Sequence, residues 1–499
     1  MSYYVIGVGG SGARSVEALI HLCAAGLAPV NVDHIKFVMV DPDTANSSWT
    51  RTEEITKTYS DLREVPKGAC DFQRLLVERL GSVWSPFGNS RAESQKLEQL
   101  FNYPALPSES RCLFDLLYTP EQRGAKLDIG FRGRPSIGAA IFGAALDVAK
   151  VEPWTSLVAD MSTATAGGER VWVFILGSLF GGTGASGLPT IARLLAGAPN
   201  VTRANLAIGG AFLLPYFQFT VPPNPGQVVY ADSLAFPRQT RQALEYYGLM
   251  SSDYNRIYAI GVDQKISQKS FSVGGSDQVN RAHVVELLAA LAAMDFFATG
   301  APGLPGAGQC AVIAREQPGE FTWADVPDVH WQDNGGRTHM VQSREKIGQL
   351  ARTAFAYLKV FYPHLKQALR DPKSTAQTPW FVDLVKNHGV DLNEKPVEDS
   401  LSAGAKLAAA CLRWLKELHT ETSGIEVRLV DVQAFGDLTN VREDPSVLDE
   451  TRFSKLVEGW KDRSLTDIWR LMCARRDRGP VRRVSGLGYF FKALYELCG

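Results

Sequence analysis

One stretch, Val171–Ala196, constrains the fold more than any other part of the chain. It begins with the apolar, β-favouring run Val171–Leu176, which is long enough for one buried strand. A glycine-rich loop follows at Gly177–Gly184, and helical spacing of apolar residues begins at Ala185. This order of strand, loop and helix directs backbone N–H groups and the positive end of a helix dipole at one spot. The natural ligand of such a nest is a phosphate.

The individual residues of this loop add to the phosphate interpretation. Glycines let the backbone approach an anion without interference from a Cβ atom. The hydroxyl groups of Thr183 and Ser186 offer additional hydrogen-bond donors. A glycine-rich turn of any α/β enzyme remains the alternative, because such motifs also match by chance. The candidate ligand-binding residues are Gly181, Gly182, Thr183, Gly184, Ala185 and Ser186.

A second glycine-rich turn lies near the N-terminus. The residues Tyr3–Gly7 predict a strand, and Gly7–Ser15 opens a helix. The glycines of this turn satisfy the pattern G-x-G-x-x-G between a strand and a helix. That context indicates nucleotide binding but does not identify the nucleotide. The candidate contacts are Gly9, Gly10, Ser11 and Gly12.

An acidic turn follows the second predicted strand, Ile35–Val40. Asp41 and Asp43 flank a proline there. An acid at the end of this strand could bind a ribose hydroxyl, or it could hold Mg²⁺ through water. An Asp-Pro turn with solvated carboxylates is the third alternative, and all three stay open.

A loop with two arginines lies at Ile129–Gly138. Arg132, Gly133 and Arg134 precede a helix that is predicted to start after Pro135. Loop arginines beside a phosphate site would neutralise its charge, because the guanidinium group binds phosphate oxygens well. A solvated basic turn is the alternative.

The alternation of strands and helices predicts the fold class. Further strands are expected at Asn205–Pro215 and Arg256–Val262, with a helix at Val228–Tyr247 between them. Together with the earlier elements, they predict an α/β protein with a doubly wound, mainly parallel sheet. A long helix at Gln278–Thr299 is apolar on most sides and should be buried between layers. Helices are also expected at Lys67–Val83 and Arg91–Phe101 in a polar, mixed region, and at 346–369 and 403–418.

The break at Pro302–Gly308 suggests that a second domain starts there. We therefore expect a nucleotide-binding domain at 1–277, a central helix at 278–300, a smaller α+β domain at 301–440 and a helical C-terminal region at 441–499. The second domain would contain short strands at Cys310–Ala314 and Glu426–Val432. Arginines gather in the C-terminal region between Arg475 and Arg483, and they predict either a solvated surface or an acidic protein partner.

The formal net charge of −1 gives no global electrostatic footprint for nucleic acid, so a nucleic-acid partner is not expected. The 7 cysteines are scattered without a CxxC pair, which favours a reducing cytosol over a disulfide or zinc framework. The sequence shows no secretory signal pattern and no apolar run of the ~20 residues that span a bilayer. These features predict a cytoplasmic protein.

The three glycine-rich loops together suggest a family, since a dinucleotide-binding fold normally needs only one. They resemble the tubulin/FtsZ superfamily of GTPases, in particular its divergent bacterial tubulin-like members. The signature of that family reads GGGTG(S/T)G, and Phe180–Gly187 is similar to it, with Phe180 in place of the first glycine. The first phosphate-binding loop of the family corresponds to Gly9–Gly12. The resemblance covers Ser2–Gly300.

Other segments fit the family more loosely. The loop at Gly130–Gly138 is similar to the family's γ-phosphate loop, although its two arginines are a departure. The acidic turn resembles the family's second loop. Pro215–Phe219 resembles the motif PFxFEG without its acid. The long predicted helix matches the central helix, whose start contacts the guanine in this family, and this implies Asn280 as the guanine contact.

The resemblance implies a function. A member of this family binds GTP or GDP with Mg²⁺, assembles with itself head to tail into filaments, and completes hydrolysis across the subunit interface. The loop that ends the central helix often reads NxDxxD there, and only Asp295 survives in this chain. Asp295 is thus the implied catalytic residue. Two alternatives stay open: a non-hydrolysing, nucleotide-bound scaffold, and a Rossmann-type enzyme that uses NAD or ATP but leaves the loop at Gly181–Gly187 unexplained.

Overall fold

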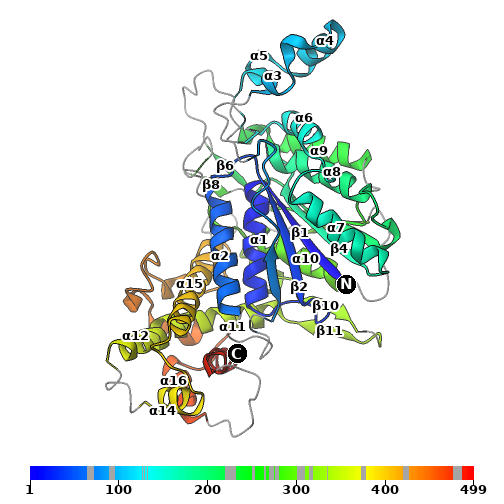
Figure 1. Ribbon diagram of the computed structural model, residues 1–499. Coiled ribbons are helices and arrows are strands. Elements are labelled where there is room, and N and C mark those ends of the chain that lie inside the picture. Colours follow the sequence, from blue (N-terminus) through cyan, green and yellow to red (C-terminus); the bar gives the residue numbers. More distant parts are fainter. Residues whose placement is uncertain are drawn as a thin grey trace.

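A seven-stranded sheet in the order β3-β2-β1-β4-β5-β7-β9 forms the centre of the protein (Figure 1), and all neighbouring strands in it are parallel. The predicted mainly parallel α/β sheet is therefore confirmed. The strands are β1 (Ser2–Val8), β2 (His34–Val40), β3 (Leu76–Arg79), β4 (Val171–Ser178), β5 (Leu206–Leu213), β7 (Arg256–Ile260) and β9 (Gln309–Ile313). The structure is a computed structural model that describes residues 1–63, 72, 74–88, 96–125, 127, 130–131, 133–219, 232–249, 253–262, 266–268, 275, 280–299, 309–313, 319–333, 335–371, 378–419, 426–475 and 486–499.

Helices cover both faces of this sheet. Side chains of a strand point alternately to its two faces, so Tyr3 of β1 joins one apolar core and Tyr4 joins the other. The first core lies under the helices α1 (Gly9–Ala24) and α10 (Val284–Ala298), and the second lies under α6 (Pro135–Ala145), α7 (Trp154–Ala166) and α8 (Gly182–Ala196). Burial on both sides explains why these strands read as nearly continuous apolar runs.

The order of the strands reverses between β1 and β4. From β1 the sheet continues outward through β2 to β3, and from β4 it continues in the other direction through β5, β7 and β9. Gly7 of β1 pairs with Leu176 of β4, so the loops that follow these two strands leave the sheet side by side. In open α/β sheets, ligands bind in the crevice at this switch point.

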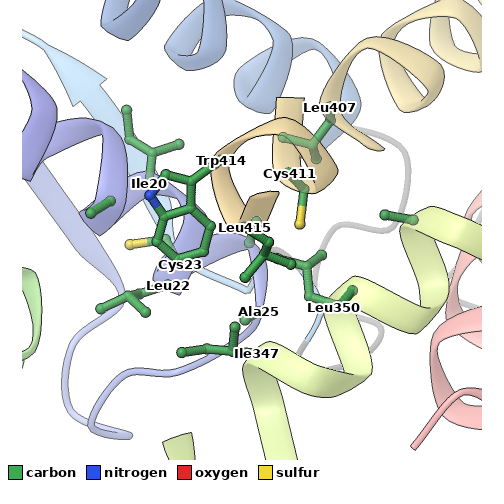
Figure 2. Packing of buried hydrophobic residues seen from close by; sticks show 14 of the residues in the cluster. Ile20, Leu22, Cys23, Ala25, Ile347, Leu350, Leu407, Cys411, Trp414 and Leu415 are labelled. Carbon is green, nitrogen blue, oxygen red and sulfur yellow. The ribbon is translucent and has the colours of Figure 1, made fainter. Parts of the chain in front are cut away.

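The C-terminal half is mainly helical and packs on α1 and α2 (Ser47–Arg63). Figure 2 shows side chains of α1, α11 and α15 meeting in one apolar cluster, among them Cys23, Leu350 and Trp414. The ring of His21 stacks on Trp414 at a centroid distance of 4.5 Å. The helices and strands here are α11 (Ser343–Ala356), α12 (Tyr362–Arg370), α14 (Pro379–Val382), α15 (Lys395–Leu418), α16 (Leu465–Ala474), α17 (Gly486–Leu497) and the antiparallel pair β10 (Val329–Gln332) and β11 (Thr338–Val341).

The remaining elements lie around the sheet. Three short helices, α3, α4 and α5, project from the body at the top of Figure 1. The bounds are α3 (Leu97–Leu100), α4 (Ser108–Leu117), α5 (Pro120–Arg123), α9 (Phe236–Leu249), β6 (Phe217–Phe219) and β8 (Ile266–Gln268). In the described part of the chain, no helix combines the length and apolarity that crossing a bilayer requires.

Several expected elements differ in the structure. The region expected to be helical at 67–83 contains β3, because Val77 pairs with Ile35 of β2 and tertiary pairing outweighs local helix propensity. Of the helix expected at 91–101, the structure describes α3 at Leu97–Leu100, and residues 91–95 lie outside the described residues. The strand expected at 426–432 forms only isolated bridges such as Phe321 to Val427.

The sheet also continues past the domain boundary that we expected at residue 301. The strand expected at Cys310–Ala314 is β9, which pairs with β7 through Cys310 and Ile257. It is therefore the edge strand of the first sheet and not part of a second one. The break at 302–308 lies outside the described residues.

Candidate functional site

The two glycine-rich loops meet at the switch point of the sheet. A Cβ atom built on Gly9 would lie 3.3 Å from the Cβ of Thr183, and one on Gly12 would lie 2.7 Å from the carbonyl oxygen of Leu176. Gly9 also has φ of +72°, a conformation that side chains disfavour. The contact between the loops therefore requires glycine, and it places both loops against one crevice.

Two helices begin at this crevice without a side-chain cap. Helix α1 starts at Gly9 after Val8, and helix α8 starts at Gly182 after Gly181. Neither N-cap residue, Val8 or Gly181, forms a side-chain capping hydrogen bond. The first N–H groups of a helix have no partner within it, and two uncapped N-termini at one place attract an anion.

The start of a third helix, α6, also borders the crevice. The loop before α6 packs on the start of α8, since a Cβ atom on Gly182 would lie 2.8 Å from the Cβ of Phe131 and 3.1 Å from the backbone nitrogen of Arg134. Gln239 of α9 fixes this loop by donating to the carbonyl oxygen of Gly133 over 2.9 Å. Arg134 is half-buried at the N-cap of α6. Arg132 lies outside the described residues.

The close packing changes the role expected of two residues in the second loop. Gly182 faces the loop at Phe131 and not an open crevice, whereas a Cβ atom on Gly181 would meet only the Ser178 hydroxyl, at 2.8 Å. The Ser186 hydroxyl is buried and donates to the carbonyl oxygen of Gly182 over 2.7 Å. It is therefore already engaged within α8.

Gly184 and Ala185 stabilise the turn of the second loop. Gly184 is buried against the backbone of Ser178, and the Ala185 N–H donates to the Gly181 carbonyl oxygen over 3.1 Å. Thr183 is half-buried. Its hydroxyl remains the candidate side-chain donor of this loop.

The acidic turn after β2 is buried and borders the first loop. Asp41 and Asp43 are each 5% exposed, so the alternative of solvated carboxylates is wrong. Asp41 accepts from the Asp43 N–H over 3.0 Å, and Asp43 accepts from the Gly275 N–H over 2.6 Å. Burial, together with the nearby charge of Asp43, raises the pKa of Asp41 to about 8. Asn46, which follows this turn, places its Nδ2 atom 3.3 Å from a Cβ atom built on Gly10.

A buried polar network lies directly behind the first loop. Arg14 of α1 donates through Nε to Glu286 of α10 over 2.5 Å and through Nη2 to the Tyr216 hydroxyl over 2.8 Å. The Tyr216 hydroxyl lies 2.6 Å from Glu286 and 3.1 Å from the Ser11 hydroxyl. Ser48 at the start of α2 accepts from Arg14 over 3.1 Å. This network holds α1, α2 and α10 together under the candidate phosphate loop.

The charges in this network stabilise one another. Burial alone would lower the pKa of Arg14, but the adjacent Glu286 carboxylate and the Tyr216 hydroxyl together outweigh the effect of burial, and the pKa is raised. Burial raises the pKa of Tyr216, which stays protonated and able to donate. The side chains of Arg14 and Glu286 are 2% and 1% exposed, so neither charge has water as an alternative partner.

Helix α10 begins later than expected. Glu286 accepts from the backbone N–H of His283 over 2.9 Å, and the Nδ1 atom of His283 accepts from the Val285 N–H over 3.1 Å. This capping box starts the helix at Val284. Asn280 therefore precedes the helix and does not lie in its first turn, and its contact with a guanine stays a prediction. Burial lowers the pKa of His283 to about 3, so this cap is neutral.

Sequence reasoning missed Arg14, Tyr216 and Glu286 as members of one site. A signal existed for Glu286, because it is the one charged residue in the apolar run from Val284 to Met294. Such an acid in a buried helix requires a partner. The partner itself could not be named, because Arg14 lies 272 positions away in the chain.

Asp295 lies near the beginning of β7, at the end of the sheet opposite the glycine-rich loops. It accepts a hydrogen bond of 2.5 Å from the Tyr258 hydroxyl and lies 3.7 Å from Arg256 at the beginning of β7. The glycine-rich loops, in contrast, follow the carboxyl ends of β1 and β4. The side chain of Asp295 is 46% exposed and is thus not a lone carboxylate in an apolar setting. Within one molecule, the structure does not bring it together with the glycine-rich loops.

The arginine cluster of the C-terminal region is described only in part. Arg475 donates to Glu496 over 2.6 Å and lies over the ring of Tyr489. Residues 476–485 lie outside the described residues. The acidic partner stays a prediction.

Comparisons with known proteins give likenesses to solved structures alone. No family model matches the chain, and no curated protein matches it. Among solved structures, it is similar to CetZ2 from Haloferax volcanii in a GTPγS-bound protofilament, at 15% identity over 52% of this chain and 49% of that chain, with a TM-score of 0.24. The chain thus spans about half the length of that protein. At this TM-score, the likeness assigns neither the ligand nor the assembly of that protein to this chain.

We predict that Arg14→Met destabilises the protein by about 3–5 kcal/mol, because the substitution leaves a buried Glu286 charge without its partner. Urea unfolding followed by circular dichroism measures the loss. The double variant Arg14→Met with Glu286→Leu should recover part of it, since no unpaired charge remains, and the part not recovered includes the loss of the Glu286 oxygen that caps the His283 N–H. A single variant as stable as the unsubstituted protein would show that the ion pair does not hold these helices together.

We also predict that the buried Asp41 carboxyl shapes the pH dependence of stability in the unliganded protein. Its pKa is raised from 3.8 unfolded to about 8 folded, so the folded state binds more protons than the unfolded state between these values. Its contribution to stability is therefore fully present below pH ~4 and is lost as the pH rises toward 8. Asp41→Asn should remove this loss. The Tm of the variant minus the Tm of the unsubstituted protein should therefore be larger at pH 8 than at pH 5. Equal Tm differences at both pH values would place the Asp41 pKa elsewhere.

Proposed function

We propose that the protein binds a guanine nucleotide, with its phosphates in the crevice between the loops that follow β1 and β4. The observation that carries this proposal is the convergence of two uncapped helix N-termini, at Gly9 and Gly182, at the switch point of a parallel sheet. Backbone N–H groups of both loops would bind the phosphate oxygens. The preference for guanine rests on the resemblance of Phe180–Gly187 to the tubulin/FtsZ signature.

The residues around the crevice would have distinct roles. The start of α6 adds a third helix N-terminus, and Arg134 there would contact the terminal phosphate. Arg132, two positions earlier in the sequence, is the second candidate for this contact. Asn280 would contact the base. Ser11 anchors the first loop to Tyr216 and Arg14 rather than pointing at a ligand.

The acidic turn fits a magnesium ion. Two buried carboxylates beside a phosphate site repel each other, and a divalent cation relieves that repulsion. Mg²⁺ is usually held by one or two carboxylates together with phosphates and water. Asp41 is the better ligand of the two, because both oxygens of Asp43 already accept backbone N–H groups, from Ala45 and Gly275. When bound, the ion would neutralise phosphate charge.

We further propose that the protein assembles head to tail into filaments. The glycine-rich loops and Asp295 lie at opposite ends of the sheet, so stacking one molecule on the next would bring the Asp295 of one subunit to the crevice of its neighbour. A heterologous interface of this kind forms an open filament when the rotation does not close. Asp295 could then orient the water that attacks the terminal phosphate.

One observation favours the non-hydrolysing scaffold as a second candidate. Asp295 is engaged by the Tyr258 hydroxyl and by Arg256 within its own subunit. Polymerisation would have to release it before it could act across the interface. If it stays engaged, the nucleotide would serve only as a structural ligand between subunits.

We predict that Gly181→Asp abolishes nucleotide binding while the protein stays folded. Gly181 is the N-cap of α8 with φ −84° and ψ 152°, a conformation that any residue adopts, and Asp is a preferred N-cap. The carboxylate would satisfy the N–H groups that the phosphate needs and would repel the phosphate itself. The affinity for GTP should fall at least ~100-fold, or about 2.8 kcal/mol, as measured by isothermal titration calorimetry.

Gly181→Ala is the matched control for this variant. It adds the same Cβ atom next to the Ser178 hydroxyl but brings no charge and no cap. It should bind GTP far better than Gly181→Asp does. Equal GTP affinities of the Asp variant and the unsubstituted protein, with the Tm retained, would remove the phosphates from this crevice.

We predict that hydrolysis, if assembly activates it, depends on Asp295 but not on Tyr258. Asp295→Asn should bind GTP and assemble, yet release phosphate far more slowly per molecule as the protein concentration rises. Tyr258→Phe removes only the hydroxyl that engages Asp295, so it should hydrolyse GTP at least as fast as the unsubstituted protein. Phosphate release and light scattering, followed together over a concentration series, separate turnover from assembly. A rate that is independent of concentration and unchanged in Asp295→Asn would contradict hydrolysis across the interface and leave nucleotide binding untouched.

A further inference from the structure

A second polar groove lies on the other side of α2, between this helix and α15. Its volume is about 370 Å³, and none of the glycine-rich loop residues lines it. Residues 439–442 border it together with the two helices. A hollow of this volume falls in the range of small-molecule sites, about 300–1,000 Å³. We call it the α2–α15 groove.

Positive charges dominate the lining of this groove. Lys406 and Arg413 are exposed on one face of α15, two helical turns apart, and neither forms an ion pair within the described part of the chain. Arg442 approaches them from the adjoining loop, and its ion pair with Glu443 is long, at 3.7 Å. Lys57 of α2 adds a fourth cation, which contacts Asp61 on the surface. The carboxylates of Glu17 and Glu54 also line the groove, so cations outnumber acids there, and Lys406 and Arg413 are the cations without an ion pair among the described residues.

The α1 side of the groove holds an acceptor without a donor. Arg51 of α2 donates to Oε1 of Glu17 over 2.7 Å and to Glu417 of α15 over 3.0 Å. The other oxygen of Glu17, Oε2, is buried and has no hydrogen-bond partner among the described residues. Glu17 is 4% exposed and lines the groove. A buried acceptor of this kind requires a partner, and a bound hydroxyl group would supply it.

We propose that the α2–α15 groove binds a phosphorylated sugar, free or as part of a nucleotide, with its phosphate at Lys406, Arg413 and Arg442 and a hydroxyl donating to Glu17. Both halves of this chemistry are needed to match the groove. A bare inorganic anion would leave Oε2 of Glu17 unsatisfied, and an uncharged sugar would leave Lys406 and Arg413 without a counter-charge. The proposal does not depend on the nucleotide in the glycine-rich crevice.

Calorimetric titration of the full chain with ribose 5-phosphate tests the proposal, with AMP as a second probe that distinguishes a nucleotide from a free sugar phosphate. We expect saturable binding of at least one probe. The double variant Lys406→Ala with Arg413→Ala should weaken that binding at least ~10-fold. Lys395→Ala is the control, because it removes one charge from α15 at a position that pairs with Asp399 and lies outside the groove.

A second variant tests the acceptor. In Glu17→Gln, the amide oxygen would replace the atom that binds Arg51, and the amide nitrogen would replace Oε2, so the acceptor is lost while the fold is checked by circular dichroism. This variant should lose the preference of the groove for ribose 5-phosphate over inorganic phosphate and keep its affinity for inorganic phosphate. An unchanged preference would exclude Glu17 from the site.

Three results would overturn the proposal. The first is that neither probe binds. The second is that a probe binds the double variant as well as it binds the unsubstituted protein, which would place the probe elsewhere, for example in the glycine-rich crevice. The third is that polyglutamate alone binds and that this binding is lost in the double variant. The last result would assign the groove to an acidic polypeptide. Loss of GTP binding in Gly181→Asp has no bearing on any of these outcomes, so the two sites can fail separately.

Discussion

The parallel pairing of β1 with β4 is the constraint on which the candidate site depends. These two strands lie where the strand order reverses, so the loops that follow them lead to helices on opposite faces of the sheet, α1 and α8, and one crevice is left between them. Gly12 is so close to the backbone of Leu176 that no side chain fits between α1 and β4. The glycines therefore have two roles that cannot be separated: they let the helices approach the sheet, and they leave backbone N–H groups uncovered at the crevice. A substitution at Gly12 would disturb the packing before it could affect a ligand, whereas a side chain at Gly181 would displace only the Ser178 hydroxyl, which can rotate away.

The ion pair between Arg14 and Glu286 explains how the crevice is held in place. A buried ion pair is weak evidence for stability, because desolvation of both charges offsets their attraction. It is strong evidence for register, since α1 and α10 can meet in only one arrangement that satisfies both charges and the Tyr216 hydroxyl. A second tie of the same kind lies next to it, where Glu417 of α15 accepts from Arg51 and from the N–H of Ala282, directly before the cap of α10. The C-terminal helices are thus fixed to α2 and to the start of α10 by polar contacts as well as by the apolar core.

Local signals were sufficient for the fold and for the loops. The apolar runs at β1, β2, β4, β5 and β7 were visible because strands buried on both faces leave no polar residues to obscure them, and glycines marked the turns between strand and helix. The sequence did not reveal β3, since a four-residue strand at the edge is defined by its pairing with Ile35 and not by its own pattern. It also placed the start of α10 too early, because the capping role of His283 depends on Glu286 in the folded helix. Arg14 and Tyr216 could not be assigned to one network, because contacts between residues this far apart leave no periodic trace in a single sequence.

Helix α10 runs between the end of the sheet that carries the glycine-rich loops and the end at which β7 begins, and nearly all of it is buried. It is 15 residues long, or about 22 Å, with its first turn bonded to Arg14 beneath the glycine-rich loop and its last turn bonded through Asp295 to Tyr258. Almost every side chain of this helix is buried, so it cannot bend or rotate locally without repacking both layers that it touches. The two ends of the helix are held differently. Its first turn is fixed in the buried network through Glu286 and Arg14, whereas the exposed carboxylate of Asp295 is held, among the described residues, by one hydrogen bond from Tyr258 and one long ion pair with Arg256.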